Sequence, residues 1–243
     1  MCDGAVRDGG GVSGPPDVLL VLAKSPVAGL AKTRLCPPAT PSDAAAIAAA
    51  ALLDTLDAVG SVPGARVMIA WTGELDRAEC ADELGRALAG VERFEQCDGP
   101  LGRRIARAHA EVARRAPGAA VLQIGMDTPQ LDAAALAAAL EPLRRARPVD
   151  AVLGPASDGG WWALGLRDPR RAGVIADVPM SRPDTGELTL RALLGAGLGV
   201  ENLAPLRDVD DAEDARAVAT LAPHGRFAVQ VRARLRLPAG GPC

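Results

Sequence analysis

The sequence predicts an α/β protein with a mostly parallel mixed sheet and helices on both faces. Short runs rich in Val, Ile and Leu alternate with longer, Ala-rich segments almost throughout the 243 residues, which is the pattern of a layered α/β domain. The short runs are apolar at successive positions, as expected of strands that are covered on both sides. Several are followed within a few residues by Lys or Asp, so charged side chains are expected at the edge of the sheet where open α/β sheets bind ligands.

The strands and helices can be placed from this pattern. The strand that begins at Trp161 and an Arg-alternating segment at 226–237, whose period of two indicates a strand, are the candidates for antiparallel neighbours. The other strands are expected at 17–23, 66–71, 91–94, 119–124, 150–154 and 200–207. Helices are expected at 41–59, 77–88, in the segment that ends at Arg115, at 133–145 and at 185–198.

The N-terminal end of the chain differs from this pattern. Residues 1–16 are rich in Gly, Pro and Asp and are expected to form a disordered tail. Gly9, Gly11 and Gly14 match the dinucleotide-binding spacing, but they precede the first strand instead of following it, so a dinucleotide site is rejected.

Composition excludes several classes of protein. The net charge of −3 and the aromatic content of 2% argue against a nucleic-acid-binding surface. No apolar run is long enough to span a membrane, and no signal peptide is recognisable. The five cysteines form no C-x-x-C pair, which favours a cytoplasmic protein without a disulfide framework. The only histidines, His109 and His224, lie near no Gly-x-Ser-x-Gly motif, so a conventional hydrolase is disfavoured.

A loop rich in cations follows the first strand. Lys24, Gly29, Lys32 and Arg34 lie within eleven residues of one another, and cations directly after a first strand suit a phosphate-binding loop. Ala31 stands where a Walker A loop needs glycine, so the loop is of another kind. The chain has 27 basic residues but only two lysines, and both lie here. A requirement for a compact, flexible ammonium group would explain this, and a solvated basic loop is the alternative.

The central strand at 119–124 presents one carboxylate. Asp127 follows it within Gly125-Met-Asp-Thr-Pro129, at the carboxyl end of the strand. A carboxylate there can hold a hard divalent cation, which in turn can hold a diphosphate. From this stretch alone, a residue that caps the turn before Pro129 is an equally good interpretation.

Two later stretches add polar groups. Asp158-Gly159-Gly160-Trp161-Trp162 follows another strand, and its glycines and tryptophans suit a sugar or a small polar acceptor, or else a tight turn with packed Trp side chains. The stretch 208–214 carries alternating carboxylates, with Asp208 and Asp210 suited to a cation and the later ones to a helix N-terminus.

These four stretches, in this order, resemble the bacterial glycosyltransferase-A-like family of nucleotide-diphospho-sugar transferases, most of whose members are uncharacterised. The family is related to 2-phospholactate guanylyltransferase and molybdenum-cofactor guanylyltransferase. The resemblance covers about residues 17–222, which we take as one domain, between the tail at 1–16 and an Arg-rich C-terminal extension at 223–243. It departs from the family at Asp211-Ala212, where relatives usually have Thr-Pro.

The resemblance implies a Rossmann-like glycosyltransferase-A fold, a nucleotide sugar or NTP donor, a small-molecule acceptor, and Mg²⁺ or Mn²⁺. By match, Lys24, Gly29, Lys32 and Arg34 would bind the donor phosphates. Asp127 and Asp210, with Asp208 nearby, would be the metal ligands. Asp158, Gly159, Gly160 and Trp161 would border the acceptor or sugar. The resemblance does not decide whether the protein forms a homo-oligomer.

The leading hypothesis is therefore a metal-dependent glycosyltransferase in which Asp127 acts through the metal and Asp158 is the candidate general base, with Asp184 and Glu187 behind it. One alternative is a nucleotidyltransferase that acts on a phosphorylated small molecule, for which no base is needed. The absence of a Gly-Gly-x-Gly loop favours glycosyl transfer. A second alternative is a non-catalytic module that binds a nucleotide sugar.

Overall fold

A single mixed sheet forms the centre of the molecule in the computed structural model, which describes residues 15–145 and 147–235. The seven strands lie in the order β3-β2-β1-β4-β6-β5-β7. Only β6 runs against its neighbours β4 and β5, and the other pairs are parallel. The predicted fold class is confirmed, including the antiparallel strand that begins at Trp161.

The strands are β1 (Val18–Lys24), β2 (Arg66–Thr72), β3 (Glu92–Glu95), β4 (Val121–Ile124), β5 (Ala151–Pro155), β6 (Trp161–Leu166) and β7 (Val200–Asn202). The α-helices are α1 (Pro41–Gly60), α2 (Ala81–Ala87), α3 (Leu101–Arg115), α4 (Ala133–Arg144), α5 (Thr185–Gly195), α6 (Ala212–Leu221) and α7 (Arg226–Arg234). Three 3₁₀ helices accompany them, η1 (Thr33–Leu35), η2 (Leu75–Arg77) and η3 (Pro169–Ile175). No helix in the described part of the chain combines the length and apolar character needed to cross a bilayer.

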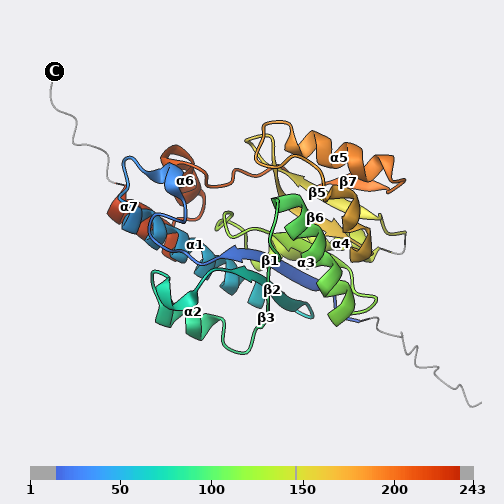
Figure 1. The fold of residues 1–243 in the computed structure, drawn as a ribbon, viewed down its shortest axis with the longest axis horizontal. Coiled ribbons are helices and arrows are strands. Elements are labelled where there is room, and N and C mark those ends of the chain that lie inside the picture. Colours follow the sequence, from blue (N-terminus) through green and yellow to red (C-terminus); the bar gives the residue numbers. More distant parts are fainter. Residues whose placement is uncertain (1–14, 146, 236–243) are drawn as a thin grey trace, which may run out of the picture.

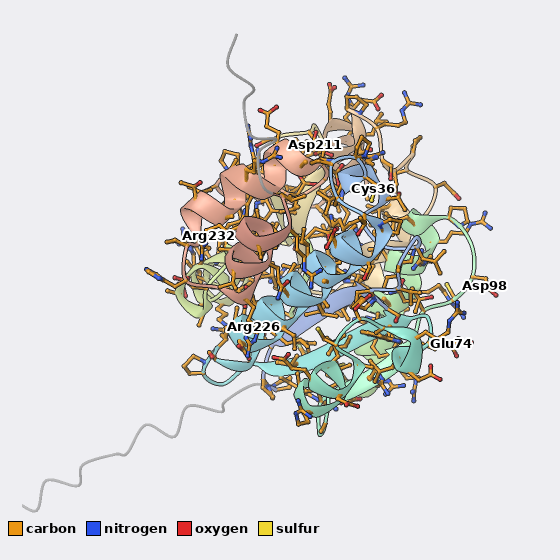
Figure 2. All side chains as sticks on the ribbon, turned by 90° about the vertical axis from the view of Figure 1, so that its left-hand side faces the viewer. Cys36, Glu74, Asp98, Asp211, Arg226 and Arg232 are labelled. Carbon is orange, nitrogen blue, oxygen red and sulfur yellow. The ribbon has the colours of Figure 1, made fainter. Side chains whose placement is uncertain are left out.

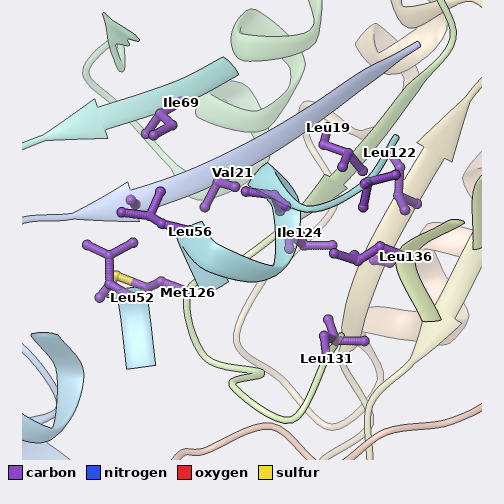
Figure 3. Packing of buried hydrophobic residues seen from close by; sticks show 14 of the residues in the cluster. Leu19, Val21, Leu52, Leu56, Ile69, Leu122, Ile124, Met126, Leu131 and Leu136 are labelled. Atoms are coloured by element: carbon purple, nitrogen blue, oxygen red, sulfur yellow. The ribbon is translucent and has the colours of Figure 1, made fainter. Parts of the chain in front are cut away.

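Alternation along the strands separates two apolar cores. In β1, Leu19 and Val21 face α1, α2 and α4, whereas Val18 and Leu20 face α3. Figure 3 shows part of the first of these cores, in which Leu52 of α1 lies beside Met126. Every one of these side chains is almost completely buried. Figure 1 shows the resulting layers, with helices on both sides of the sheet. Because the helices cover both faces, a ligand can reach the sheet at the carboxyl ends of its strands.

The predicted strand at 226–237 is wrong, because the described part of this segment forms helix α7. Phe227, Val231 and Leu235 recur every four residues and are buried against α1 and α6, whereas Val229 is 52% exposed. The Asp54 carboxylate of α1 accepts the N–H groups of Arg226 and Phe227 at 3.0 and 2.8 Å, which caps the positive end of α7. The tertiary contact thus overrides the period of two.

Helix α7 lies beside α1 and α6 (Figure 1), and Figure 2 looks onto this side of the molecule, with Arg226 and Arg232 labelled. The described part of the predicted C-terminal extension is therefore packed onto the helical layer, with Phe227 fully buried. Other elements are shorter than expected. The only strand within 200–207 is β7, and 77–88 contains α2 and the last residue of η2. Of the predicted tail at 1–16, all but Pro15 and Pro16 lies outside the described residues, as do residues 236 and 237.

His109 in α3 gives the fold a pH dependence. Its imidazole is fully buried and neither ring nitrogen has a hydrogen-bond partner in the described structure. Burial lowers the pKa of His109 to about 4, so between its ordinary pKa near 6.5 and about 4 only the unfolded chain takes up the proton. Because the unfolded state binds more protons in this window, stability should fall as the pH falls through it.

We expect His109→Leu to remove this part of the acid sensitivity. Relative to the wild type, the variant should gain about 2 kcal/mol of unfolding free energy between pH 7.5 and pH 5, as measured by urea unfolding at both pH values. The same substitution at His224, which is exposed, is the control and should leave the dependence unchanged. Parallel pH profiles for the wild type and His109→Leu would contradict the assignment.

Candidate functional site

A cleft of about 850 Å³ opens at the carboxyl edge of the sheet. It lies where the chain leaves β1 and β4 and where the β5–β6 hairpin turns, as expected for a ligand site in an open α/β sheet. Its charged lining residues are Lys24, Lys32, Arg34, Arg104, Asp127, Asp158, Arg182, Asp208 and Asp210. The charged residues predicted for phosphate and metal, together with Asp158 as the first candidate for the base, are therefore brought together in one place.

Backbone hydrogen bonds hold the acidic segments side by side. The N–H of Val209 donates to the carbonyl of Asp127 at 3.0 Å, which joins the segment after β7 to the loop after β4. The N–H of Ser157 donates to the carbonyl of Leu206 at 2.9 Å, which joins the same segment to the β5–β6 hairpin. Asp158 and Asp208 each follow or precede a residue that makes one of these bonds. The backbone therefore determines how far apart the carboxylates lie.

The loop after β1 reaches into this acidic cleft. Lys32 has a left-handed backbone (φ 49°), and its Nζ lies 2.8 Å from Asp127 Oδ1 and 4.0 Å from Asp210 Oδ1. The ammonium also donates to the carbonyl of Val209. Arg34 Nη1 lies 2.7 Å from Asp210 Oδ2. Two of the three cations predicted for phosphate are thus paired with two of the three carboxylates predicted for the metal.

The remaining members of the cation loop differ in position. Lys24 Nζ donates to the carbonyl of Leu30 at 2.5 Å, and both residues line the cleft. Gly29 is absent from the cleft lining, and its φ of 76° shows that it forms the turn at the tip of the loop. Its contribution is therefore to the path of the loop.

Oxygen atoms of Asp158, Asp208 and Asp210 lie within 4.8 Å of one another. Burial, followed by the neighbouring carboxylates of Asp158 and Asp210, raises the pKa of Asp208 to about 6. A set of carboxylate oxygens that repel one another fits a hard divalent cation. The sequence grouped Asp127 with Asp208 and Asp210, whereas the structure groups Asp158 with them and gives Asp127 to Lys32.

The turn at 158–160 is shaped by its contacts with the start of α5. Asp158 Oδ1 accepts the N–H of Gly160 at 2.7 Å, and the N–H of Gly186 donates to the carbonyl of Gly159 at 2.8 Å. Gly159 has a φ of 87°, and a Cβ on it would lie 1.9 Å from the carbonyl oxygen of Pro183. Gly160 lines the cleft and Gly159 does not. Gly159 therefore fixes the turn that presents Asp158.

The tryptophans form part of the wall. Trp161 lines the cleft and donates from Nε1 to Thr189 Oγ1 at 3.1 Å. Trp162 is 7% exposed and donates to the carbonyl of Ala204 at 3.0 Å. Neither Asp184 nor Glu187 lines the cleft. The Asp184 carboxylate pairs with Arg182, which does line it, and the Glu187 carboxylate pairs with Arg191.

Three further polar residues of the cleft, Gln96, Arg104 and Gln123, were not predicted from the sequence. Gln96, after β3, donates to the carbonyls of Ala23 and Ala70 at 2.9 and 2.7 Å. Its Oε1 accepts Arg104 Nε at 3.0 Å, which positions this guanidinium at the start of α3. Gln123 of β4 also lines the cleft, is 3% exposed, and has no partner for its Oε1 in the described structure. A Gln in the middle of an otherwise apolar strand is the signal that could have identified it.

The chain was compared with known families. Residues 55–182, just over half of the chain, match the family described as "uncharacterized protein conserved in bacteria (DUF2064)". The chain belongs to this family. The matched range includes Asp127 and Asp158, whereas the cation loop and Asp208 and Asp210 lie outside it. The expectation of a largely uncharacterised bacterial family is confirmed, and no curated protein sequence matches the chain.

Solved structures share the fold. A protein from Desulfovibrio desulfuricans G20, proposed to be a nucleotide-diphospho-sugar transferase, is 23% identical, with a TM-score of 0.78 over 90% of this chain and 95% of that one. A cytidylyltransferase from Leptospira borgpetersenii is 11% identical, with a TM-score of 0.53 over 90% of this chain and 93% of that one. A 4-diphosphocytidyl-2C-methyl-D-erythritol synthase from Anaerococcus prevotii is 10% identical, with a TM-score of 0.52 over 86% and 97%. At these identities the likeness establishes the nucleotide-diphospho-sugar transferase fold.

We expect Gly159→Ala to destabilise the protein far more than a comparable glycine substitution elsewhere. The new methyl group would collide with Pro183, so the 158–160 turn or the start of α5 must move, at a cost of about 3 kcal/mol or more. Gly64→Ala is the matched control, because Gly64 also has a positive φ (71°) but open space around it, and it should cost about 1 kcal/mol. Equal costs for the two variants in urea unfolding would show that the Pro183 contact is unimportant.

Proposed function

We propose that this protein is a metal-dependent transferase that uses a nucleotide-diphosphate donor, and that it transfers a sugar from a nucleotide sugar to a small acceptor. The observation that carries the proposal is the convergence of three loop cations and four carboxylates in one cleft at the carboxyl edge of the sheet. A diphosphate needs the cations, and a divalent cation needs the carboxylates.

Under this proposal, Lys24, Lys32 and Arg34 bind the donor diphosphate. Asp127 and Asp210, with Asp208 beside them, hold Mg²⁺ or Mn²⁺. The cation, once bound, neutralises charge on the leaving diphosphate. The family resemblance and the likeness to the Desulfovibrio protein, which extends over most of both chains, support a nucleotide-sugar donor.

We assign the acceptor side of the cleft to the wall formed by the turn between β5 and β6 and the start of β6. Trp161 and Gly160 border this wall, and Asp158 projects from its turn toward Asp208 and Asp210. A small polar acceptor fits such a wall, because the indole offers an apolar surface while backbone and carboxylate groups accept hydrogen bonds. We propose that Asp158 takes the proton of the attacking hydroxyl group.

Nucleotidyl transfer is the second candidate. The cytidylyltransferases that share the fold support it, and the same loop cations and metal would stabilise a pyrophosphate leaving group. In that reaction the attacking phosphate is already ionised, so Asp158 would have no proton to remove. The two functions therefore differ in the donor that binds and in the effect of removing Asp158.

A thermal-shift panel tests the donor class. With Mg²⁺ or Mn²⁺, one nucleotide sugar should raise the melting temperature by mass action. Asp127→Asn should lose the metal-dependent part of the shift, whereas Asp76→Asn, which makes the same charge change at an exposed position, should keep it. A metal-dependent shift with an NTP alone would favour nucleotidyl transfer. If no nucleotide gave a metal-dependent shift, the proposal would fail in both forms.

We expect Asp158→Asn to separate binding from turnover. If Asp158 is the general base, the variant should keep the metal-dependent thermal shift and lose about 100-fold or more in the rate of product formation, measured by mass spectrometry with the donor from the panel and a pool of sugar, polyol and phosphorylated acceptors. Loss of the metal-dependent shift would instead make Asp158 a metal ligand. Unchanged turnover would remove it from both roles, and binding without turnover by the wild type would favour a non-catalytic module.

A further inference from the structure

The cation loop and the acidic cleft neutralise each other through ion pairs. Lys32 is paired with Asp127, and Arg34 with Asp210. Two positive and two negative groups thus form two ion pairs, although under the proposed function the cations serve a diphosphate and the carboxylates serve a metal. The groups that each ligand requires are therefore already paired with one another.

Lys32 occupies the position of a cation among oxygen ligands. Its Nζ contacts a carboxylate oxygen of Asp127 and the carbonyl oxygen of Val209, and lies 4.0 Å from a carboxylate oxygen of Asp210. Carboxylate and carbonyl oxygens are also what a hard divalent cation uses. The Lys32 side chain is only 11% exposed, so the ammonium sits within the cleft and is poorly screened by solvent.

The surrounding backbone keeps the Lys32 ammonium close to these carboxylates. The Val209 N–H to Asp127 carbonyl bond holds the acidic segments at a fixed spacing, and Leu35, fully buried, anchors the loop that carries Lys32. Because these contacts fix the spacing, a metal held by Asp127 and Asp210 would take the same oxygen atoms that surround the Lys32 ammonium. A long, flexible lysine side chain, in contrast, can leave its carboxylate and reach a phosphate with little movement of the backbone.

We propose that Lys32 is a resident cation that competes with the metal, so that metal and diphosphate bind cooperatively by exchange of ion pairs. This inference rests on the proposed function. Metal alone must displace Lys32 from Asp127 without offering the ammonium a new partner. Diphosphate alone must withdraw Lys32 and leave Asp127 without a counter-ion. When both bind, the metal takes the carboxylates and the diphosphate takes the ammonium, so neither loss remains. Linkage requires each ligand to raise the affinity for the other by the same factor.

Direct metal binding tests the exchange. Mn²⁺ is titrated calorimetrically into nucleotide-free protein, and Lys32→Met should bind it about tenfold more tightly than the wild type, within the range of typical coupling energies. Lys24→Met is the matched control, because it removes the same charge from the same loop while Lys24 contacts the carbonyl of Leu30 and, within the described structure, no carboxylate. The control should change the affinity for Mn²⁺ much less.

The reciprocal measurement uses Asp127→Asn, which should bind the nucleoside diphosphate without metal more tightly than the wild type does, because Lys32 is freed. Circular dichroism and urea unfolding confirm that each variant is folded. Equal or weaker Mn²⁺ binding by folded Lys32→Met, or equal tightening by Lys24→Met, would overturn the exchange while leaving the proposed function standing. Failure of every variant to bind Mn²⁺, with or without nucleotide, would overturn both.

Discussion

The hydrogen bond from the Val209 N–H to the Asp127 carbonyl, 3.0 Å long, is the contact on which the site depends. It joins two segments that lie far apart in the sequence, the loop after β4 and the segment after β7. Without it, Asp127 would be separated from Asp208 and Asp210. Because Val209 is itself buried, the carboxylates on either side of it are presented outward while the backbone between them is fixed.

Four carboxylates in one cleft repel one another. Lys32 and Arg34 reduce this repulsion in part, because they pair with Asp127 and Asp210. Asp208, which lies near two other carboxylates, has a pKa raised to about 6 by burial and by Asp158 and Asp210. Such crowding is costly in a site with no ligand and is relieved by a divalent cation. Ligand binding and the stability of the cleft are therefore connected through the same few groups.

The sequence predicted the fold class and pointed to most of the charged residues that line the cleft, because both depend on local patterns. Continuous apolar runs identify covered strands, and charged residues directly after strands must lie at one edge of the sheet. The Lys32–Asp127 contact could not be predicted, because no local pattern fixes the distance between side chains on different loops. The Gln96–Arg104 pair was missed for a related reason. The hydrogen bond from Gln96 to Ala23 of β1 depends on the strand order β3-β2-β1, which no local pattern fixes.

Helix α7 shows where a local pattern fails. Its arginines suggest a period of two, yet the period of four in Phe227, Val231 and Leu235 determines which side is buried. The choice is made by α1, which supplies an apolar surface and the Asp54 carboxylate that caps the new helix. In a short amphipathic segment, such contacts outweigh propensity.

The most direct test of the account is a crystal structure with Mn²⁺ and a nucleoside diphosphate, in which the metal is located by its anomalous signal. The account predicts one strong peak in the cleft, in contact with Asp127 and Asp210, and predicts that the Lys32 ammonium has left Asp127 for the diphosphate. A peak held by Asp158, Asp208 and Asp210 with Lys32 still on Asp127 would contradict the exchange of ion pairs. A peak outside the cleft would contradict the assignment of the site.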